Sequence, residues 1–127
     1  MNLLAACRKW AAVACLALAA PGMAPAQTPA PARHIDIKVV AHKPVGGART
    51  ERVHQGDTVV IRTQSDEPLS VHVHGYDVHG EVAPGSVASL SFVARWTGRF
   101  PVGAHPAKGS AAPHGPEPTL LYLEVLP

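Results

Sequence analysis

From residue 34 onward, apolar and polar residues alternate over short runs. Ile35, Ile37 and Val39 interleave with polar neighbours, a period of two that predicts a β-strand with one buried face. Similar runs, many of them rich in β-branched residues, follow at regular spacing and are separated by turns that contain Gly or Pro. The predicted strands are residues 34–39, 58–63, 69–74, 78–82, 87–94, 98–104 and 119–125. Because no stretch of eleven residues after residue 26 has an apolar period of 3.6, we expect little helix and an all-β sandwich of about seven strands.

The first 26 residues have a different pattern, which is typical of an export signal. Arg8 and Lys9 precede an unbroken apolar run from Trp10 to Ala20, and small residues up to Ala26 suit a signal peptidase. The run is about half as long as a bilayer-spanning helix. We therefore expect cleavage after Ala26, no membrane insertion after cleavage, and a periplasmic or secreted protein.

The remaining chain is predicted to form one domain. Residues 27–32 are rich in Pro and Ala and are expected to be an extended linker. Residues 33–127 are enough for one hydrophobic core and too few for two.

Removal of the predicted signal peptide changes the chemistry that is available. Both cysteines, Cys7 and Cys15, and both methionines, Met1 and Met23, lie within it, whereas all eight histidines follow it. The exported chain would have no disulfide, thiolate nucleophile or soft metal ligand. Eleven Lys and Arg less Arg8 and Lys9 leave nine, against nine Asp and Glu, so no basic surplus favours nucleic acid.

Histidine spacing is the strongest chemical signal. His72 and His74 lie two positions apart in a predicted strand, so both rings leave the same face roughly 6 to 7 Å apart. The long Pro-rich segment 105–118 carries His105 and His114. If this segment folds over the end of the sandwich where His72 lies, the imidazoles converge and suit Cu(II) or Zn(II), with copper favoured by intrinsic affinity. The alternative is a solvated strand face and a stiff loop with solvated histidines.

Several segments resemble cupredoxins. Residues 53–59 resemble the turn and strand that begin the cupredoxin domain, and residues 71–77 resemble its first ligand strand. Residues 83–100 are similar to the strand pair before the ligand loop, and residues 121–125 to the last strand. The chain looks most like small exported cupredoxin-like domains of the EfeO type, which occur alone or as modules in metal-uptake proteins. The resemblance implies a Greek-key β-sandwich.

The resemblance also implies where copper ligands belong. The first copper histidine of the family matches His72, and the second histidine of the ligand loop matches His114. The family's cysteine falls at Ala104, next to His105, and its axial methionine has no counterpart. Because a blue-copper centre requires a thiolate, we do not expect electron transfer of the plastocyanin type.

We therefore predict an exported protein that handles metal. Copper, with zinc as the alternative, would bind His72, His105 and His114, and His74 would be a fourth ligand or a hydrogen-bonded neighbour of the ligands. The other hypothesis is a metal-free interaction module, or an accessory domain of an envelope metal-uptake system, that docks on an envelope protein and holds no metal.

We do not expect an enzyme. A histidine brace would need a histidine as the first residue after cleavage, where Gln27 is expected. No Gly-x-Ser-x-Gly motif presents Ser65 or Ser70 for hydrolysis, and we assign Asp77 to a turn and His79 to the surface.

Overall fold

The structure is a computed structural model that describes Gly22 and residues 31–109 and 115–127. The predicted signal peptide apart from Gly22, most of the predicted linker, and His114 lie outside these residues. The described residues form nine strands and no helix, and so include no helix capable of crossing a membrane. The strands are β1 (Arg33–Val40), β2 (Lys43–Pro44), β3 (Arg49–His54), β4 (Thr58–Ser65), β5 (Leu69–Val73), β6 (Val78–Val82), β7 (Val87–Val93), β8 (Gly98–Pro106) and β9 (Thr119–Leu126).

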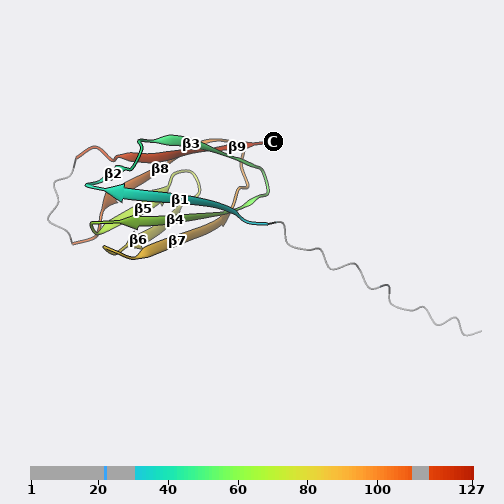
Figure 1. The fold of residues 1–127 in the computed structure, drawn as a ribbon. Coiled ribbons are helices and arrows are strands. Elements are labelled where there is room, and N and C mark those ends of the chain that lie inside the picture. The colour runs from blue at the N-terminus through green and yellow to red at the C-terminus, as the bar shows by residue number, and fades with distance from the viewer. Residues whose placement is uncertain (1–21, 23–30, 110–114) are drawn as a thin grey trace, which may run out of the picture.

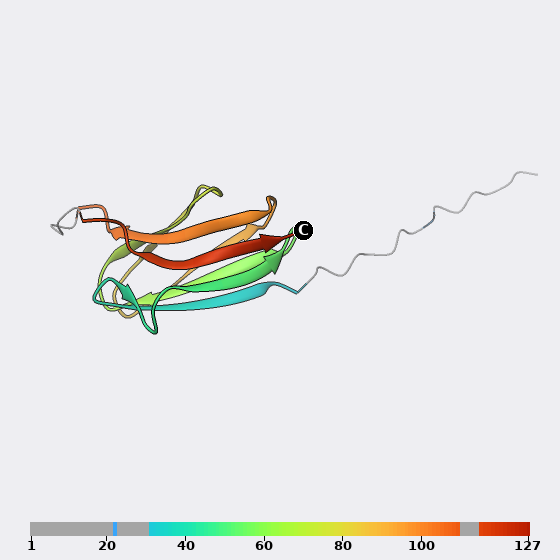
Figure 2. The same cartoon turned by 90° about the horizontal axis from the view of Figure 1, so that it is seen from above.

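The strands form two sheets that pack face to face (Figures 1 and 2). The four-stranded sheet has the order β2-β1-β4-β7, and the five-stranded sheet has the order β3-β9-β8-β5-β6. Parallel pairs, β1 with β4 and β3 with β9, join strands that are not consecutive in the chain. The predicted all-β sandwich is confirmed, and the described residues form nine strands where about seven are expected.

The two additional strands lack the pattern on which the prediction depended. β2 has only two residues, and β3 has the sequence Arg-Thr-Glu-Arg-Val-His, of which only Val53 is buried. β3 lies at the edge of its sheet and forms its ladder with β9 over Arg49–His54. Its strand conformation is therefore set by backbone pairing with β9, which hydrophobic periodicity does not detect.

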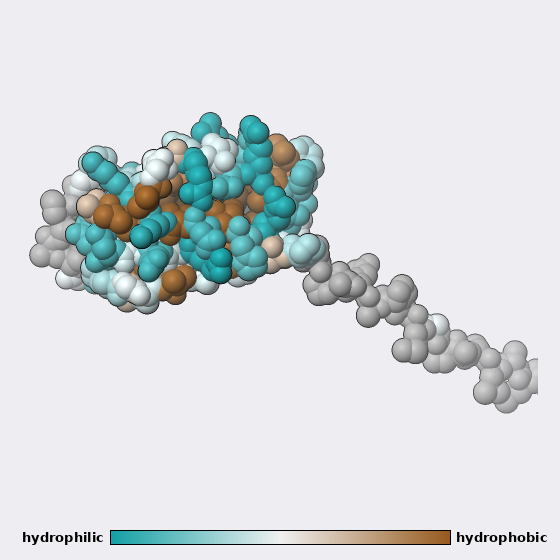
Figure 3. All heavy atoms as spheres, in the orientation of Figure 1, coloured by the Kyte–Doolittle hydropathy of each residue, from teal (hydrophilic) through white to brown (hydrophobic). Residues whose placement is uncertain are grey.

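The core lies between the two sheets and is built from the alternating apolar positions. Its largest fully buried apolar side chains come from both sheets: Ile61, Leu69, Leu120, Leu121 and Leu123. Burying one such side chain contributes about 1.5–3 kcal/mol to folding. On the face shown in Figure 3, apolar side chains are visible in patches between polar side chains.

Aromatic side chains cover the core near the turn that joins β5 to β6. The Tyr76 ring lies 4.9 Å from the Phe92 ring and 4.8 Å from the Phe100 ring, in each case between centroids. The Tyr76 hydroxyl donates a hydrogen bond to the Trp96 carbonyl oxygen (2.8 Å) and accepts one from the Trp96 backbone N–H (3.1 Å). Tyr76 therefore ties this turn to the segment between β7 and β8.

Candidate metal centre

The outer face of the five-stranded sheet carries a group of histidines from β5, β6 and β8. Val71 and Val73 of β5 are buried in the core, so His72 between them points away from it. The register pairs His72 with His79 on β6 and with Gly103 on β8. The His72 and His79 rings are stacked, with centroids 4.0 Å apart and planes inclined by 11°. Strand pairing alone thus brings these two imidazoles together.

His105 lies on the same face, near the end of β8. The predicted loop from residue 105 begins later than expected, because β8 continues to Pro106. The register pairs His105 with Ser70, two residues from His72 on β5, and the His72 and His105 ring centroids are 6.2 Å apart. The backbone position of His105 is therefore fixed by the pairing of β8 with β5.

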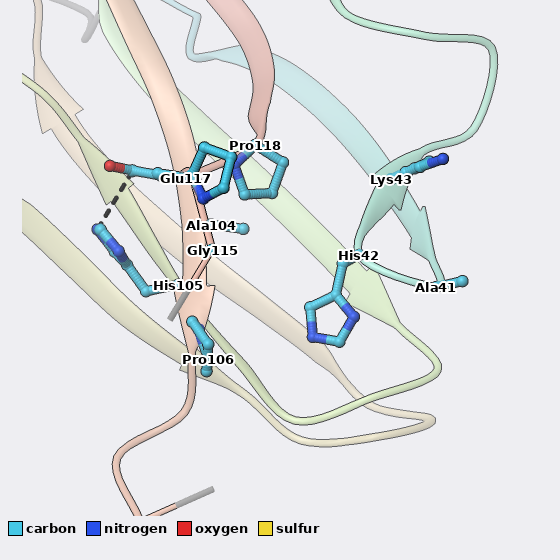
Figure 4. Close-up of a pocket in the computed structure, with 10 residues that line it drawn as sticks. Ala41, His42, Lys43, Ala104, His105, Pro106, Gly115, Glu117 and Pro118 are labelled. Atoms are coloured by element: carbon cyan, nitrogen blue, oxygen red, sulfur yellow. Dashed lines mark ion pairs between the residues drawn. The ribbon is translucent and has the colours of Figure 1, made fainter. Parts of the chain in front are cut away.

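A carboxylate joins the histidines from the segment that precedes β9. Glu117 Oε1 lies 2.9 Å from His74 Nε2 and 3.2 Å from His105 Nε2 (the latter pair is drawn in Figure 4). The Glu117 side chain lies over Gly103: a Cβ atom at Gly103 would be only 1.8 Å from Glu117 Oε1. The missing side chain at position 103 thus provides the space that the carboxylate occupies.

The turn between β5 and β6 contributes the other polar groups. The His74 backbone N–H donates to the Pro101 carbonyl oxygen (3.0 Å), and the His74 ring centroid is 4.3 Å from that of His72. Asp77 has a positive φ of 54°, and its Oδ1 lies 3.0 Å from His79 Nε2. Asp residues tolerate this left-handed conformation better than most residues, so the turn can close while its carboxylate faces β6.

Two sets of potential metal ligands result, and they share His72. In one set, His72, His105 and Glu117 each offer a ligand atom, and these atoms lie within 4.8 Å of one another. In the other, the same criterion is met by His72, Asp77 and His79. Imidazole nitrogen and carboxylate oxygen are suitable ligands for Cu(II) and Zn(II).

The electrostatics of the cluster favour a neutral imidazole at its centre. The pKa of His72 is lowered, chiefly because partial burial disfavours its charged form, and further by the neighbouring His79, His74 and His105. Glu117 acts in the opposite direction, towards a higher pKa. A neutral imidazole has the free lone pair that metal binding requires.

A pocket of about 370 Å³ borders this centre. His105 and Glu117 lie on one side of it, and His42 and Lys43 lie on the opposite side (Figure 4). His42 Nδ1 contacts the Glu67 carboxylate, and His42 is in neither set of ligands.

Three of the four histidines proposed from the sequence come together, and three further residues join them. His72, His74 and His105 lie in one cluster, whereas His114 is outside the described residues. Glu117 is not predicted from the sequence, which indicates only a turn position for Asp77 and a surface position for His79. The predicted strands 69–74 and 78–82 held a usable signal for His79, because pairing them as a hairpin places it opposite His72.

Comparison with known proteins supports the fold. No family model matches the chain, and no curated protein matches its sequence. Among solved structures, a heme-copper terminal oxidase dimer is 21% identical, with a TM-score of 0.52, 74% of this chain covered and 63% of that chain. A multicopper oxidase is 21% identical, with a TM-score of 0.54 and coverage of 73% and 41%. A multi-copper oxidase from Pediococcus acidilactici is 14% identical, with a TM-score of 0.55 and coverage of 73% and 25%.

These structures correct one prediction. The expectation that the chain is not an enzyme is contradicted, because the solved structures that share its fold include a heme-copper terminal oxidase and multicopper oxidases. The chain spans less than two thirds of the length of each of them. At 14–21% identity, the likeness shows a shared cupredoxin-like fold and leaves the activity of this small domain open.

Proposed function

We propose that the protein is an exported cupredoxin-like domain that binds a divalent metal ion, copper in preference to zinc, for metal handling. The ligands are His72, His105 and Glu117, and His74 is a fourth ligand or holds the Glu117 carboxylate in place. The observation that carries this proposal is that ligand atoms of three residues, from β5, β8 and the segment before β9, lie within 4.8 Å of one another.

The donor set fits the proposed ion. Two ligand atoms that each bind an ion at about 2.0–2.1 Å are at most about 4.2 Å apart. The candidate ligand atoms already lie within 4.8 Å of one another, so small side-chain rotations complete the site. Two imidazoles and a carboxylate favour Cu(II) over Zn(II) by intrinsic affinity. The chain after residue 26 contains no Cys or Met, so its ligands suit Cu(II) better than Cu(I).

His74 has a supporting position whether or not it binds the ion. Its Nε2 lies within hydrogen-bond distance of Glu117 Oε1, the same atom that faces His105. Hydrogen bonds of this kind fix the orientation of a ligand carboxylate, and their loss typically costs about 10–100-fold in metal affinity. In the sequence, His114 remains a further candidate ligand.

Export is part of the proposal and is supported by the pattern of the N-terminal region. Residues 1–26 would be removed, residues 27–32 would be a linker, and residues 33–127 would form the domain that meets metal outside the cytoplasm. A small domain of the EfeO type would serve either as a separate carrier or as a module of an envelope metal-uptake system.

The test is a Cu(II) competition titration of tag-free protein, expressed as the full chain and purified from the exported fraction. We expect one tightly bound equivalent, and we expect His72→Ala to weaken binding by about 100-fold or more. His54→Ala is the control, because His54 is an exposed histidine of β3 that belongs to neither ligand set. Equal affinity in wild type and His72→Ala would refute the site, and a chain that takes up no metal would favour the metal-free interaction module.

A further inference from the structure

We propose that the domain has a second, outward metal position formed by His72, Asp77 and His79, and that one ion moves between it and the position at Glu117. This inference rests on the proposed function and extends it. The outward position is the one at which copper is exchanged with solvent or with a partner. His72 is a ligand in both positions.

The geometry of three side chains supports the second position. Ligand atoms of His72, Asp77 and His79 lie within 4.8 Å of one another, by the same measure that groups His72 with His105 and Glu117. His79 is fixed opposite His72 by the β5–β6 ladder, and Asp77 Oδ1 lies 3.0 Å from His79 Nε2. The second position thus has two imidazoles and one carboxylate, the same donor types as the first.

The two positions differ in the exposure of their carboxylates. The Glu117 side chain is 25% exposed, whereas the side chains of His79 and Asp77 are 53% and 96% exposed. A carboxylate that is nearly fully exposed keeps its water, so its bond to an ion gains less than that of a sheltered one. The Asp77 position is therefore the weaker and the more accessible of the two.

His72 connects the two positions. Because this ring belongs to both sets, an ion that leaves one position keeps one ligand while it acquires the other two. Two divalent ions that shared the His72 ring as a ligand would repel each other in a partly buried site. We therefore expect one ion per domain, which alternates between the positions.

The experiment compares Cu(II) binding and the electron paramagnetic resonance spectrum in wild type and variants. Wild type should bind one equivalent at the Glu117 position. Glu117→Gln should still bind one equivalent, about 10–100-fold more weakly and with a different spectrum, because the ion then lies at the Asp77 position. Adding His79→Ala to Glu117→Gln should remove this remaining binding, and His72→Ala should remove both spectra.

Kinetics test the exchange role. His79→Ala and Asp77→Asn remove ligands of the outward position, so each should slow both copper loading and copper removal by a chelator. Asp77→Asn preserves the turn, because Asn also tolerates positive φ. His34→Ala is the control, since His34 is an exposed residue of β1 in the other sheet.

Three outcomes would overturn this inference while leaving the proposed function intact. They are a complete loss of binding in Glu117→Gln, residual binding in Glu117→Gln that does not depend on His79, and loading rates unaffected by both His79→Ala and Asp77→Asn. Two tightly bound equivalents in wild type would also overturn it. Failure of the proposed function has a different signature, since wild type itself would then bind no copper.

Discussion

Gly103 is the most informative position at which to perturb the proposed centre without touching a ligand. A Cβ atom there would lie 1.8 Å from Glu117 Oε1 and 2.6 Å from Glu117 Cδ, whereas ordinary contacts begin at 3.4 Å. Gly103→Ala must therefore push the carboxylate oxygen away by about 1.6 Å, the difference between 3.4 and 1.8 Å. Metal–ligand bonds tolerate deviations of only about 0.2 Å, so the displaced carboxylate no longer binds an ion held by His72 and His105.

The expected cost falls on metal binding and spares the fold. Losing an interaction that holds or provides a ligand weakens metal affinity by about 10–100-fold, or about 1.4–2.8 kcal/mol. Gly103 does not have a positive φ, and the atom in the way belongs to a side chain, so the backbone can keep its conformation. Replacing Gly by Ala at a compatible position even stabilises the folded state by about 0.4–1 kcal/mol, because it restricts the unfolded chain.

The assay is the Cu(II) competition titration together with thermal unfolding in the presence of a chelator. Gly115→Ala is the matched control, because Gly115 lies two residues before Glu117 and a Cβ atom there would meet nothing within 4 Å. We expect weakened copper binding in Gly103→Ala alone and a melting temperature that does not fall in either variant. Wild-type affinity in Gly103→Ala would refute the placement of Glu117 among the ligands.

Two further predictions concern stability. Tyr76→Phe should lower the free energy of unfolding by about 1–3 kcal/mol in chemical denaturation, because the Trp96 backbone loses both a donor and an acceptor partner; an unchanged midpoint would contradict this. Because the pKa of His72 is lowered in the folded state, the unfolded state binds more protons below about pH 6.5, so metal-free protein should lose stability as the pH falls through that value. His72→Gln should flatten this dependence of the unfolding free energy on pH, and an equally steep dependence in the variant would argue against the assignment.

The elements that the sequence predicts correctly are those whose side chains carry the alternation. β1 and β5 are examples, since Ile35, Ile37 and Val71 are buried and their neighbours are not. β3 is missed, because its strand conformation depends on pairing with β9 and only one of its side chains enters the core. Local patterning therefore reveals strands that supply the core, and it overlooks strands that are added at an edge.

The same distinction applies to the candidate centre. His72 and His74 are apparent from their spacing in the sequence, although β5 ends at Val73 and His74 lies in the turn that follows. His79 follows from the register of a single hairpin. Glu117 has no comparable signal, since its position depends on the path of the chain between β8 and β9 and on the gap that Gly103 leaves. Residues brought in by long-range packing are the part of the site that sequence spacing does not supply.

The two faces of β8 place the position of the family's cysteine and the proposed centre on opposite sides of the sheet. The resemblance places the family's cysteine at Ala104, and the Ala104 side chain is 2% exposed, within the core cluster between the sheets. Gly103 and His105, its neighbours, face the opposite side, where Glu117 and His72 lie. A thiolate at position 104 would thus point away from the imidazoles of the cluster. The proposed centre therefore shares His72 with the copper site that the resemblance implies, but its other candidate ligands lie on the outer face of the sheet, and the position of the family's cysteine lies in the core.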